Sequence, residues 1–156
     1  MINMRDDAYY MQLALYEAES AQLKGEVPVG ALVVCGDEVL SSGHNSNVTG
    51  HDPTAHAEIV ALRRASALSR NHRLPDCDLY VTLEPCAMCL GAMVQARVRR
   101  LVFGALDPKS GAVESIMVFP VDKTNHRMQI KGGVLGQECG KILKDFFRQK
   151  RMQPTR

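Results

Sequence analysis

The sequence lacks a run of about 18 apolar residues, the length that a membrane-spanning helix needs. It also lacks the charged, apolar and small-residue segments that together form a secretory signal. No internal repeat or low-complexity stretch interrupts the chain. We therefore expect a single domain over residues 1–156, in a protein of the cytoplasm that is not associated with a membrane.

The pattern of the cysteines does not suit a secreted disulfide framework. There are five cysteines, an odd number, and Cys86 and Cys89 lie only three positions apart. This spacing favours reduced thiols with a metal or redox role. Cys35, Cys77 and Cys139 have no ligand-type neighbour at metal-binding spacing, so we expect small buried apolar side chains at these positions.

Excess charge is also nearly absent, because the formal net charge is only +2. The exception is the C-terminal segment, where residues 141–156 hold six basic residues against one acidic residue. Such a segment is typical of contact with an anionic partner such as nucleic acid. The sequence thus predicts a basic C-terminal helix at about 137–151, whereas the rest of the chain is not basic.

Apolar residues recur with helical spacing in some segments and form short buried runs in others. Helices are expected over residues 6–24, 54–70, 86–97 and about 137–151, and strands over 29–35, 39–43, 78–84, 99–105 and 127–133. Residues 107–125 are expected to form one short helix and a long loop. Helices that alternate with strands after an opening hairpin predict an α/β fold, a three-layer α/β/α sandwich with a central mixed five-stranded sheet.

Three side chains predict a zinc site. Cys86 and Cys89 would share one face at the start of a helix, where the dipole and free N–H groups favour thiolates. His56, at the start of the preceding helix, would be the third ligand, and the sequence offers no obvious fourth. A structural zinc site normally has four protein ligands, so three ligands leave a position for water and predict catalysis. A redox dithiol is the alternative, but thioredoxin-like motifs lack an accompanying HxE.

Glu58, two positions after His56, is the candidate proton carrier. On an ideal helix, two positions correspond to a rotation of about 200°, which would point Glu58 away from His56. The two side chains can face the same space only if His56 lies at the helix cap, before the backbone becomes helical. The alternative is an ordinary charge on the helix surface.

The stretches "HAE" and "PCAMC" resemble the H-x-E and P-C-x-x-C signature of zinc-dependent nucleobase deaminases. The likeness extends to "EVPVGALVV", "DPTAHAE", "LYVTLEPCAMC", "VFGA", "NHR" and "DFF", which are similar to the bacterial tRNA-specific adenosine deaminases over nearly the whole chain. This resemblance implies a cytidine-deaminase-like fold, one zinc ion per chain on His56, Cys86 and Cys89, and hydrolysis of a wobble adenosine in a tRNA anticodon to inosine. Glu58 would then carry a proton from the attacking water to the purine ring nitrogen and help ammonia to leave.

The same resemblance assigns the walls of the substrate pocket. Asn45 would hydrogen-bond the target base. The backbone of Ala57 and the segment 27–30, which includes Val29, would enclose it. Asn45 could instead be a turn residue, a role that the stretch "GHNSN" would also suit.

The resemblance also implies contacts with the rest of the RNA. Asp107 would lie close to the ribose of the flanking nucleotide, although a turn-forming aspartate before a proline is an equal alternative. Apart from the resemblance, the basic residues near Phe146 and Phe147 suit phosphate, and Phe147 is a candidate to stack against a base. Leu143, Phe146 and Phe147 also have the spacing of core residues, so at least one phenylalanine is expected inside. A homodimer that binds the tRNA anticodon stem-loop across both subunits is implied as well.

Three other functions are compatible with parts of this pattern. A guanine or cytosine deaminase acting on a free base shares "DPTAHAE" and a closely similar cysteine motif, but it needs no basic C-terminal segment. A riboflavin-pathway deaminase carries extra residues between its cysteines, unlike this chain. A zinc-stabilised RNA-binding module without chemistry would need neither an open ligand position nor Glu58.

Overall fold

Within residues 5–153, the part of the chain that this computed structural model describes, helices and strands alternate as expected. The elements are α1 (Asp7–Leu23), β1 (Gly30–Cys35), β2 (Glu38–His44), α2 (Ala57–Ser69), β3 (Cys77–Leu83), α3 (Ala87–Ala96), β4 (Arg100–Ala105), η1 (Val121–Lys123), β5 (Gln129–Lys131) and α4 (Gly136–Met152). Every expected element is present, with its ends within three residues of the expected ones. None of the helices in this range is long and apolar enough to cross a bilayer.

The strands form one mixed sheet in the order β2-β1-β3-β4-β5. β1 pairs antiparallel with both β2 and β3, whereas the pairs β3–β4 and β4–β5 are parallel. Parallel neighbours need a crossover between them, and α3 supplies the crossover from β3 to β4. The predicted mixed five-stranded sheet is therefore confirmed.

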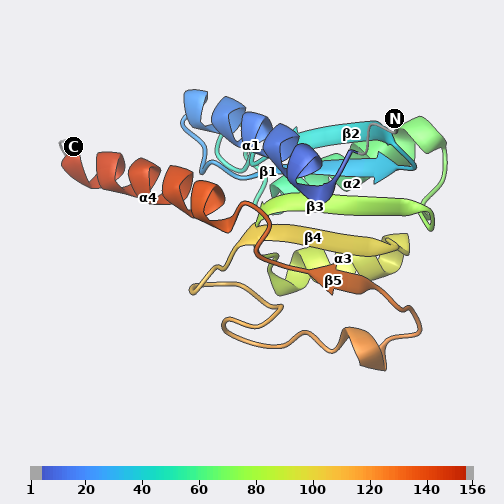
Figure 1. Ribbon diagram of the computed structural model, residues 1–156. Helices are drawn as coiled ribbons and strands as arrows, with labels where there is room; N and C mark the ends of the chain where they lie inside the picture. The colour runs from blue at the N-terminus through green and yellow to red at the C-terminus, as the bar shows by residue number, and fades with distance from the viewer. Residues whose placement is uncertain (1–4, 154–156) are drawn as a thin grey trace.

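Helices cover both faces of the sheet. Figure 1 shows α1 and α4 on one face, with α2 and α3 on the other. Side chains of β1 alternate between the two cores, because Ala31 and Val33 pack on the α2 side while Leu32 and Val34 pack on the α1 side. A strand buried on both faces has to be apolar at nearly every position, which explains the run "GALVVC". The three-layer α/β/α sandwich is thus confirmed.

α1 packs directly onto β1, whose first residues lie at the end of the sheet where β3 finishes. The helix begins where the Asp6 carboxylate accepts a hydrogen bond from the Tyr9 N–H at 2.9 Å. It ends before Gly25, whose φ of 78° is favourable for glycine. A Cβ atom at Gly30 would lie only 2.0 Å from the Ala14 carbonyl oxygen. Glycine at the start of β1 therefore allows the close approach of helix and strand.

The expectation of reduced, unlinked thiols is wrong for Cys35 and Cys77, which form a disulfide. Cys35 ends β1 and Cys77 begins β3, and the antiparallel register places them opposite each other, with Cα atoms 4.3 Å apart. Their separation of 42 positions hides this relation in the sequence, because only the register of the sheet reveals it. Cys139 is free and buried, as expected.

α3 is less buried than its nearly continuous apolar sequence predicts. Cys89, Leu90 and Met93 are fully buried against the sheet and α2, whereas Met88 is 39% exposed and Gln95 faces solvent. Neighbouring elements cover only one side of this helix. An apolar strip on its outer side therefore stays accessible.

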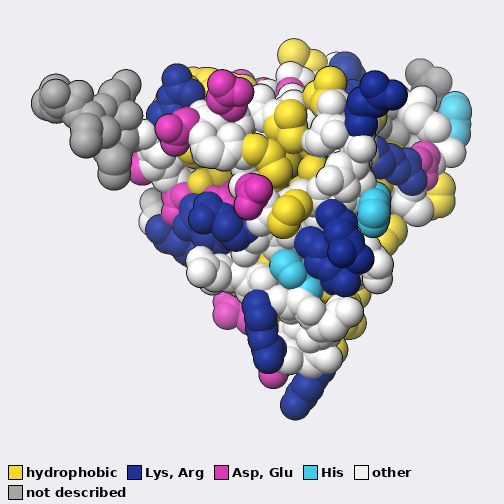
Figure 2. All heavy atoms as spheres, turned by 90° about the vertical axis from the view of Figure 1, so that its right-hand side faces the viewer, with side chains coloured by type: hydrophobic (Ala, Val, Ile, Leu, Met, Phe, Trp, Pro, Cys, Tyr) yellow, Lys and Arg dark blue, Asp and Glu magenta, His cyan; other side chains and the backbone are white. Residues whose placement is uncertain are grey.

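The end of the sheet where β3 and β4 begin carries charges of both signs. Figure 2 looks onto this end and shows Lys and Arg side chains scattered among acidic, histidine and uncharged residues. Arg99 and Arg100 both pair with Asp78, and Arg100 also pairs with Asp7. The opposite end of the sheet is different, because the ligand-type side chains lie there.

Candidate metal centre

His56 and Cys86 each occupy the position immediately before a helix. His56 precedes α2 with φ −68° and ψ 154°, and Cys86 precedes α3 with φ −80° and ψ 173°, so both have extended backbone. Neither side chain caps its helix with a hydrogen bond. Cys89 lies in the first turn of α3. The two helix starts thus direct three ligand-type side chains into one space, as the sequence predicts.

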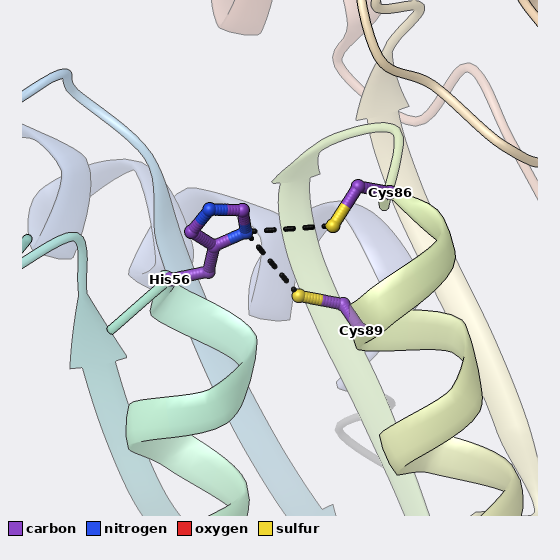
Figure 3. A group of neighbouring side chains, drawn as sticks. All are labelled: His56, Cys86 and Cys89. Atoms are coloured by element: carbon purple, nitrogen blue, oxygen red, sulfur yellow. Dashed lines mark hydrogen bonds between the residues drawn. The ribbon is translucent and has the colours of Figure 1, made fainter. Parts of the chain in front are cut away.

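Figure 3 shows the His56 ring directed toward the two cysteine sulfur atoms. Its Nδ1 atom lies 3.5 Å from Sγ of Cys86 and 3.5 Å from Sγ of Cys89. Tetrahedral zinc with ordinary Zn–N and Zn–S bond lengths separates such atoms by about 3.5 Å. The donor types and their spacing therefore fit a zinc ion, and no other His, Cys, Asp or Glu of residues 5–153 joins this group.

The three side chains also shift one another's protonation. A hydrogen bond from Cys89, assisted by His56, lowers the pKa of Cys86 to about 4 despite its partial burial. The same contact with Cys86, together with burial, raises the pKa of Cys89. Hydrogen bonding to Cys86 raises the pKa of His56. A thiolate thus forms readily at Cys86, and a metal ion would have to displace the proton held by Cys89.

Glu58 lies in the first turn of α2 with only 4% of its surface exposed. Because His56 precedes the helix, the rotation that would separate the two side chains on an ideal helix does not apply. Burial raises the pKa of Glu58 to about 7, although its own N–H and the nearby His56 oppose this shift. The cap geometry that the sequence required is therefore confirmed. A carboxyl group with a pKa near neutrality can both accept and donate a proton.

Asn45 is half-buried just after β2 and supports the start of α2. Its Oδ1 atom accepts a hydrogen bond from the Ala57 N–H at 2.9 Å. Its own N–H donates to the Val29 carbonyl oxygen at 3.2 Å. Asn45 therefore holds the helix start rather than a turn, and its Nδ2 atom has no partner among residues 5–153. Val29 and Ala57 are both buried next to it.

Asp107 follows β4, and its carboxylate stabilises a tight local turn. It accepts hydrogen bonds from the Lys109 N–H at 3.0 Å and from the Ser110 hydroxyl at 2.8 Å. The turn-forming role is therefore present in the structure. Contact between Asp107 and a ribose stays a prediction.

A groove of about 780 Å³ separates the ends of β3 and β4 from α4, which extends beyond the sheet in Figure 1. Its charged lining residues are Asp107, Lys109, Lys144, Lys150 and Arg151. Phe147 also lines the groove and is 39% exposed, whereas Phe146 is buried. The core phenylalanine expected from the helical spacing is thus Phe146. Arg156, the last basic residue, lies outside the described residues.

Sequence reasoning missed two buried carboxylates near these elements, Glu26 and Glu84, each only 2% exposed. Glu26 accepts hydrogen bonds from the N–H groups of Val48 at 3.2 Å and Thr49 at 2.6 Å, in the loop that follows β2. Glu84 binds the segment that follows β4 in the same way. The stretch "LYVTLEP" does indicate a special role for Glu84, because an acidic residue adjoining a buried strand needs hydrogen-bond partners.

Comparison with known proteins places this geometry in a family. The family described as MafB19-like deaminase matches residues 5–151. A tRNA-specific adenosine deaminase of Haemophilus influenzae is 46% identical over 147 residues, which cover 93% of this chain and 85% of the relative.

Solved structures agree with this assignment. One, from studies of A-to-I editing by tRNA:A34 deaminases at the wobble position of transfer RNA, has a TM-score of 0.83 and 46% identity, with 86% of this chain and 99% of that chain covered. A guanine deaminase of Nitrosomonas europaea has a TM-score of 0.80 at 23% identity, with 93% of this chain and 86% of that chain covered, and so shows the shared fold alone. This chain therefore belongs to the tRNA-specific adenosine deaminase family.

Proposed function

We propose that this protein deaminates adenosine at the wobble position of a tRNA anticodon and so produces inosine and ammonia. The observation that carries the proposal is the convergence of His56, Cys86 and Cys89 beside the buried carboxyl group of Glu58. Family membership supplies the substrate class, since the Haemophilus influenzae relative is a tRNA-specific adenosine deaminase. A free-base deaminase would not need the basic groove beside α4.

His56, Cys86 and Cys89 would hold one zinc ion per chain. The soft sulfur and imidazole donors suit zinc, and their mutual distances suit its tetrahedral geometry. When bound, such an ion supplies hydroxide near neutral pH. A site with three protein ligands keeps one position for water or substrate, as catalytic zinc sites do.

Glu58 would move the protons of the reaction. Its carboxylate would accept a proton from the attacking water, and the resulting carboxylic acid would donate that proton to the purine ring nitrogen. The oxygen of the water bonds to the carbon that bears the amino group. The second water proton leaves with the amino group as ammonia, so adenosine and water give inosine and ammonia. Burial of Glu58 favours a neutral carboxyl group at this stage.

Asn45 would orient the target base. Because its Oδ1 atom accepts the Ala57 N–H, its Nδ2 atom is the group left to donate to a ring nitrogen of the base. The hydrogen bond between Asn45 and Val29 fixes the backbone at this point. Val29 and Ala57 would then form the apolar wall of the pocket.

The groove beside α4 would hold the RNA on either side of the target nucleotide. Its basic side chains outnumber its single acidic one, and Phe147 offers an exposed ring for stacking. Lys144 and Lys150 form no ion pair with any acidic residue of the part of the chain described here. The mixed charge of the opposite end, shown in Figure 2, is less suited to a polyanion. Asp107 would approach the ribose of the flanking nucleotide.

A homodimer is part of this proposal. Met88 on the outer side of α3 is 39% exposed, and the exposed Val118 lines a hollow of about 450 Å³. Exposed apolar surface of this kind suits a second copy of the chain. The reaction would take place in the cytoplasm. Sedimentation velocity should give twice the mass of one chain, and a strictly monomeric species would remove the dimer from the proposal.

Ammonia release from a small substrate panel tests the assignment. The panel contains an anticodon stem-loop with adenosine at the wobble position, the same stem-loop with guanosine there, free guanine and free cytosine. We expect ammonia from the adenosine stem-loop alone. Ammonia from a free base, with none from the stem-loop, would replace the proposal with a free-base deaminase.

A further inference from the structure

Glu84 lies between a strand end and a metal-ligand turn, yet its side chain faces neither. Its backbone N–H donates to the Ala105 carbonyl oxygen at 2.8 Å, so it still belongs to the β3–β4 pairing. Cys86 follows two residues later. The carboxylate is almost completely buried and turns toward residues 107–115, which we call the rim segment.

The Glu84 carboxylate binds both ends of the rim segment. Its Oε1 atom accepts the Asp107 N–H at 3.0 Å and the Ser115 hydroxyl. Its Oε2 atom accepts the N–H groups of Val113 at 2.9 Å, Glu114 at 2.8 Å and Ser115 at 3.0 Å. A carboxylate with such a set of donors makes hydrogen bonds about twice as strong as neutral ones. One side chain thus supplies the hydrogen-bond acceptors that the backbone of a strand or helix would otherwise give to these N–H groups.

The rim segment is also closed tightly around that carboxylate. A Cβ atom at Gly111 would lie 2.3 Å from the Glu84 carboxylate carbon and from its Oε1 atom. The Ala112 N–H donates to the Pro85 carbonyl oxygen at 2.8 Å, directly before Cys86. The segment is therefore attached to the turn of the ligand cluster by side chain and backbone together.

The outer side of the rim segment lines the groove beside α4. Asp107, Lys109 and Ser110 contribute to the groove wall opposite Phe147. The Lys109 Nζ atom lies 5.4 Å from the centre of the Phe147 ring. The position of this wall relative to Cys86 is set through Glu84.

We propose that Glu84 is a positioning residue for the RNA: its buried carboxylate holds the rim segment at a fixed place beside the turn that carries Cys86. Glu84 touches neither the base nor the metal ligands in this role. Its effect reaches the substrate through Asp107 and Lys109. The kinetic part of this proposal rests on the proposed function, whereas its structural part does not.

Glu84→Gln is the direct test. One end of the glutamine amide is an NH₂ group, which cannot accept the N–H groups that converge on the carboxylate. The KM for the anticodon stem-loop should rise by about tenfold, while kcat stays within about twofold, because the lost contacts bind ground state and transition state alike. The zinc content per chain should not change.

Glu114→Gln is the matched control. It makes the same chemical change in an exposed glutamate of the rim segment. Only the backbone N–H of Glu114 binds Glu84, and its side chain forms no hydrogen bond among residues 5–153. KM should match that of the parent. Gly111→Ala should mimic Glu84→Gln, because its methyl group would occupy the place of the carboxylate. Ser115→Ala removes one donor and should raise KM by about twofold.

Amide hydrogen exchange gives a readout that does not depend on activity. The amides of Glu114 and Ser115 belong to exposed residues, yet they should exchange slowly in the parent protein. Glu84→Gln should accelerate their exchange by about tenfold and leave the amides of α3 unchanged. If Glu84→Gln does not fold, Gly111→Ala and Ser115→Ala are compared with the parent in the same way.

Two results would overturn the proposal. In the first, KM and amide exchange in the rim segment stay at parental values. In the second, zinc content and kcat fall together, which would make Glu84 a support of the ligand turn alone. If the parent releases no ammonia from the stem-loop, the proposed function fails, and the exchange comparison still decides the role of Glu84.

Discussion

Strand β3 has a cysteine at its start and another just beyond its end, and the two are used differently. Cys77 at the start is joined to Cys35 in a disulfide. Cys86 beyond the end keeps a free thiol with a lowered pKa and faces His56 and Cys89. The first end fixes neighbouring strands to each other, while the second presents ligand-type side chains beside a basic groove. Under the proposed function, stability and reactivity are separated along a single strand.

The largest effect is expected when a cysteine is replaced at each end of β3, which tests whether the two ends have separate roles. Cys86→Ser should reduce zinc to less than about a tenth of an ion per chain and activity by on the order of a thousandfold, because a thiolate ligand is lost. Cys77→Ser, at the other end, should keep both. Metal analysis and ammonia release measure the two effects. Loss of zinc in Cys77→Ser would show that the two ends are not independent.

Glu58→Gln should separate proton transfer from metal binding at the reactive end. The variant should retain zinc, while kcat falls by about a hundredfold or more, because a general acid–base group contributes on that scale. Zinc content and kcat should be measured on the same preparation, with Glu114→Gln as the control for loss of one negative charge. A parental kcat would exclude Glu58 from the mechanism.

Removing the disulfide should affect stability and leave chemistry intact. The bond closes a loop between positions separated by 42 residues, so Cys35→Ser should lower the free energy of unfolding by about 2–4 kcal/mol. Urea unfolding with and without a reductant measures this difference, and the reductant should have little effect on the variant. Equal stability of parent and variant, both without reductant, would contradict the prediction.

A pH series measures how much the charged residues at the Cys77 end of the sheet contribute to the free energy of unfolding. Burial alone would raise the pKa of Asp7, but hydrogen bonds from Arg100 and Lys131 lower it to about 2. Since its ordinary value is 3.8, ionised Asp7 contributes stability above about pH 4 that is lost as the pH falls toward 2. Asp7→Asn should therefore lower the free energy of unfolding by on the order of 1–2 kcal/mol at pH 7. The difference from the parent should shrink toward pH 2, and a pH-independent difference would contradict this account.

The smallest expected effect concerns the basic groove. Lys150→Ala should lower the slope of log affinity against log salt by about 0.7 for a single-stranded RNA contact, because one fewer counterion is released. Lys141→Ala is the control on the same helix, since Lys141 pairs with Asp145 at 2.6 Å and does not line the groove. Affinity for the stem-loop across a salt series measures both slopes. Equal slopes for parent and Lys150→Ala would remove Lys150 from the phosphate contacts.

Local spacing was sufficient for the pair of cysteines but not for features that depend on register, on side-chain direction or on a second helix start. Cys86 and Cys89 share a helix turn, so their proximity follows from the sequence. The Cys35–Cys77 bond depends on which residues of β1 and β3 lie opposite each other, which spacing cannot give. His56 at a helix cap could be stated only as a condition, because the exact start of α2 was not readable.

Spacing in the sequence is also insufficient to predict the residues around the cluster of His56, Cys86 and Cys89. Phe146 and Phe147 are adjacent and point about 100° apart on a helix, so spacing alone could not decide which is buried. Glu84 lies inside a stretch recognised for its cysteines, but its partners come from a segment whose structure the sequence left open. Backbone donors of an irregular loop have no sequence signature. Such partners emerge only when the loop is placed in space.

The two helix starts that carry His56 and Cys86 have a consequence for the evolution of this chain. Serine, aspartate or asparagine at such a position would satisfy free N–H groups and contribute about 1 kcal/mol, and neither ligand makes that bond. A serine in place of Cys86 should therefore raise the stability of the metal-free protein, and under the proposed function it would abolish activity. Selection for heat resistance alone would favour that exchange, and only selection for catalysis would retain the sulfur.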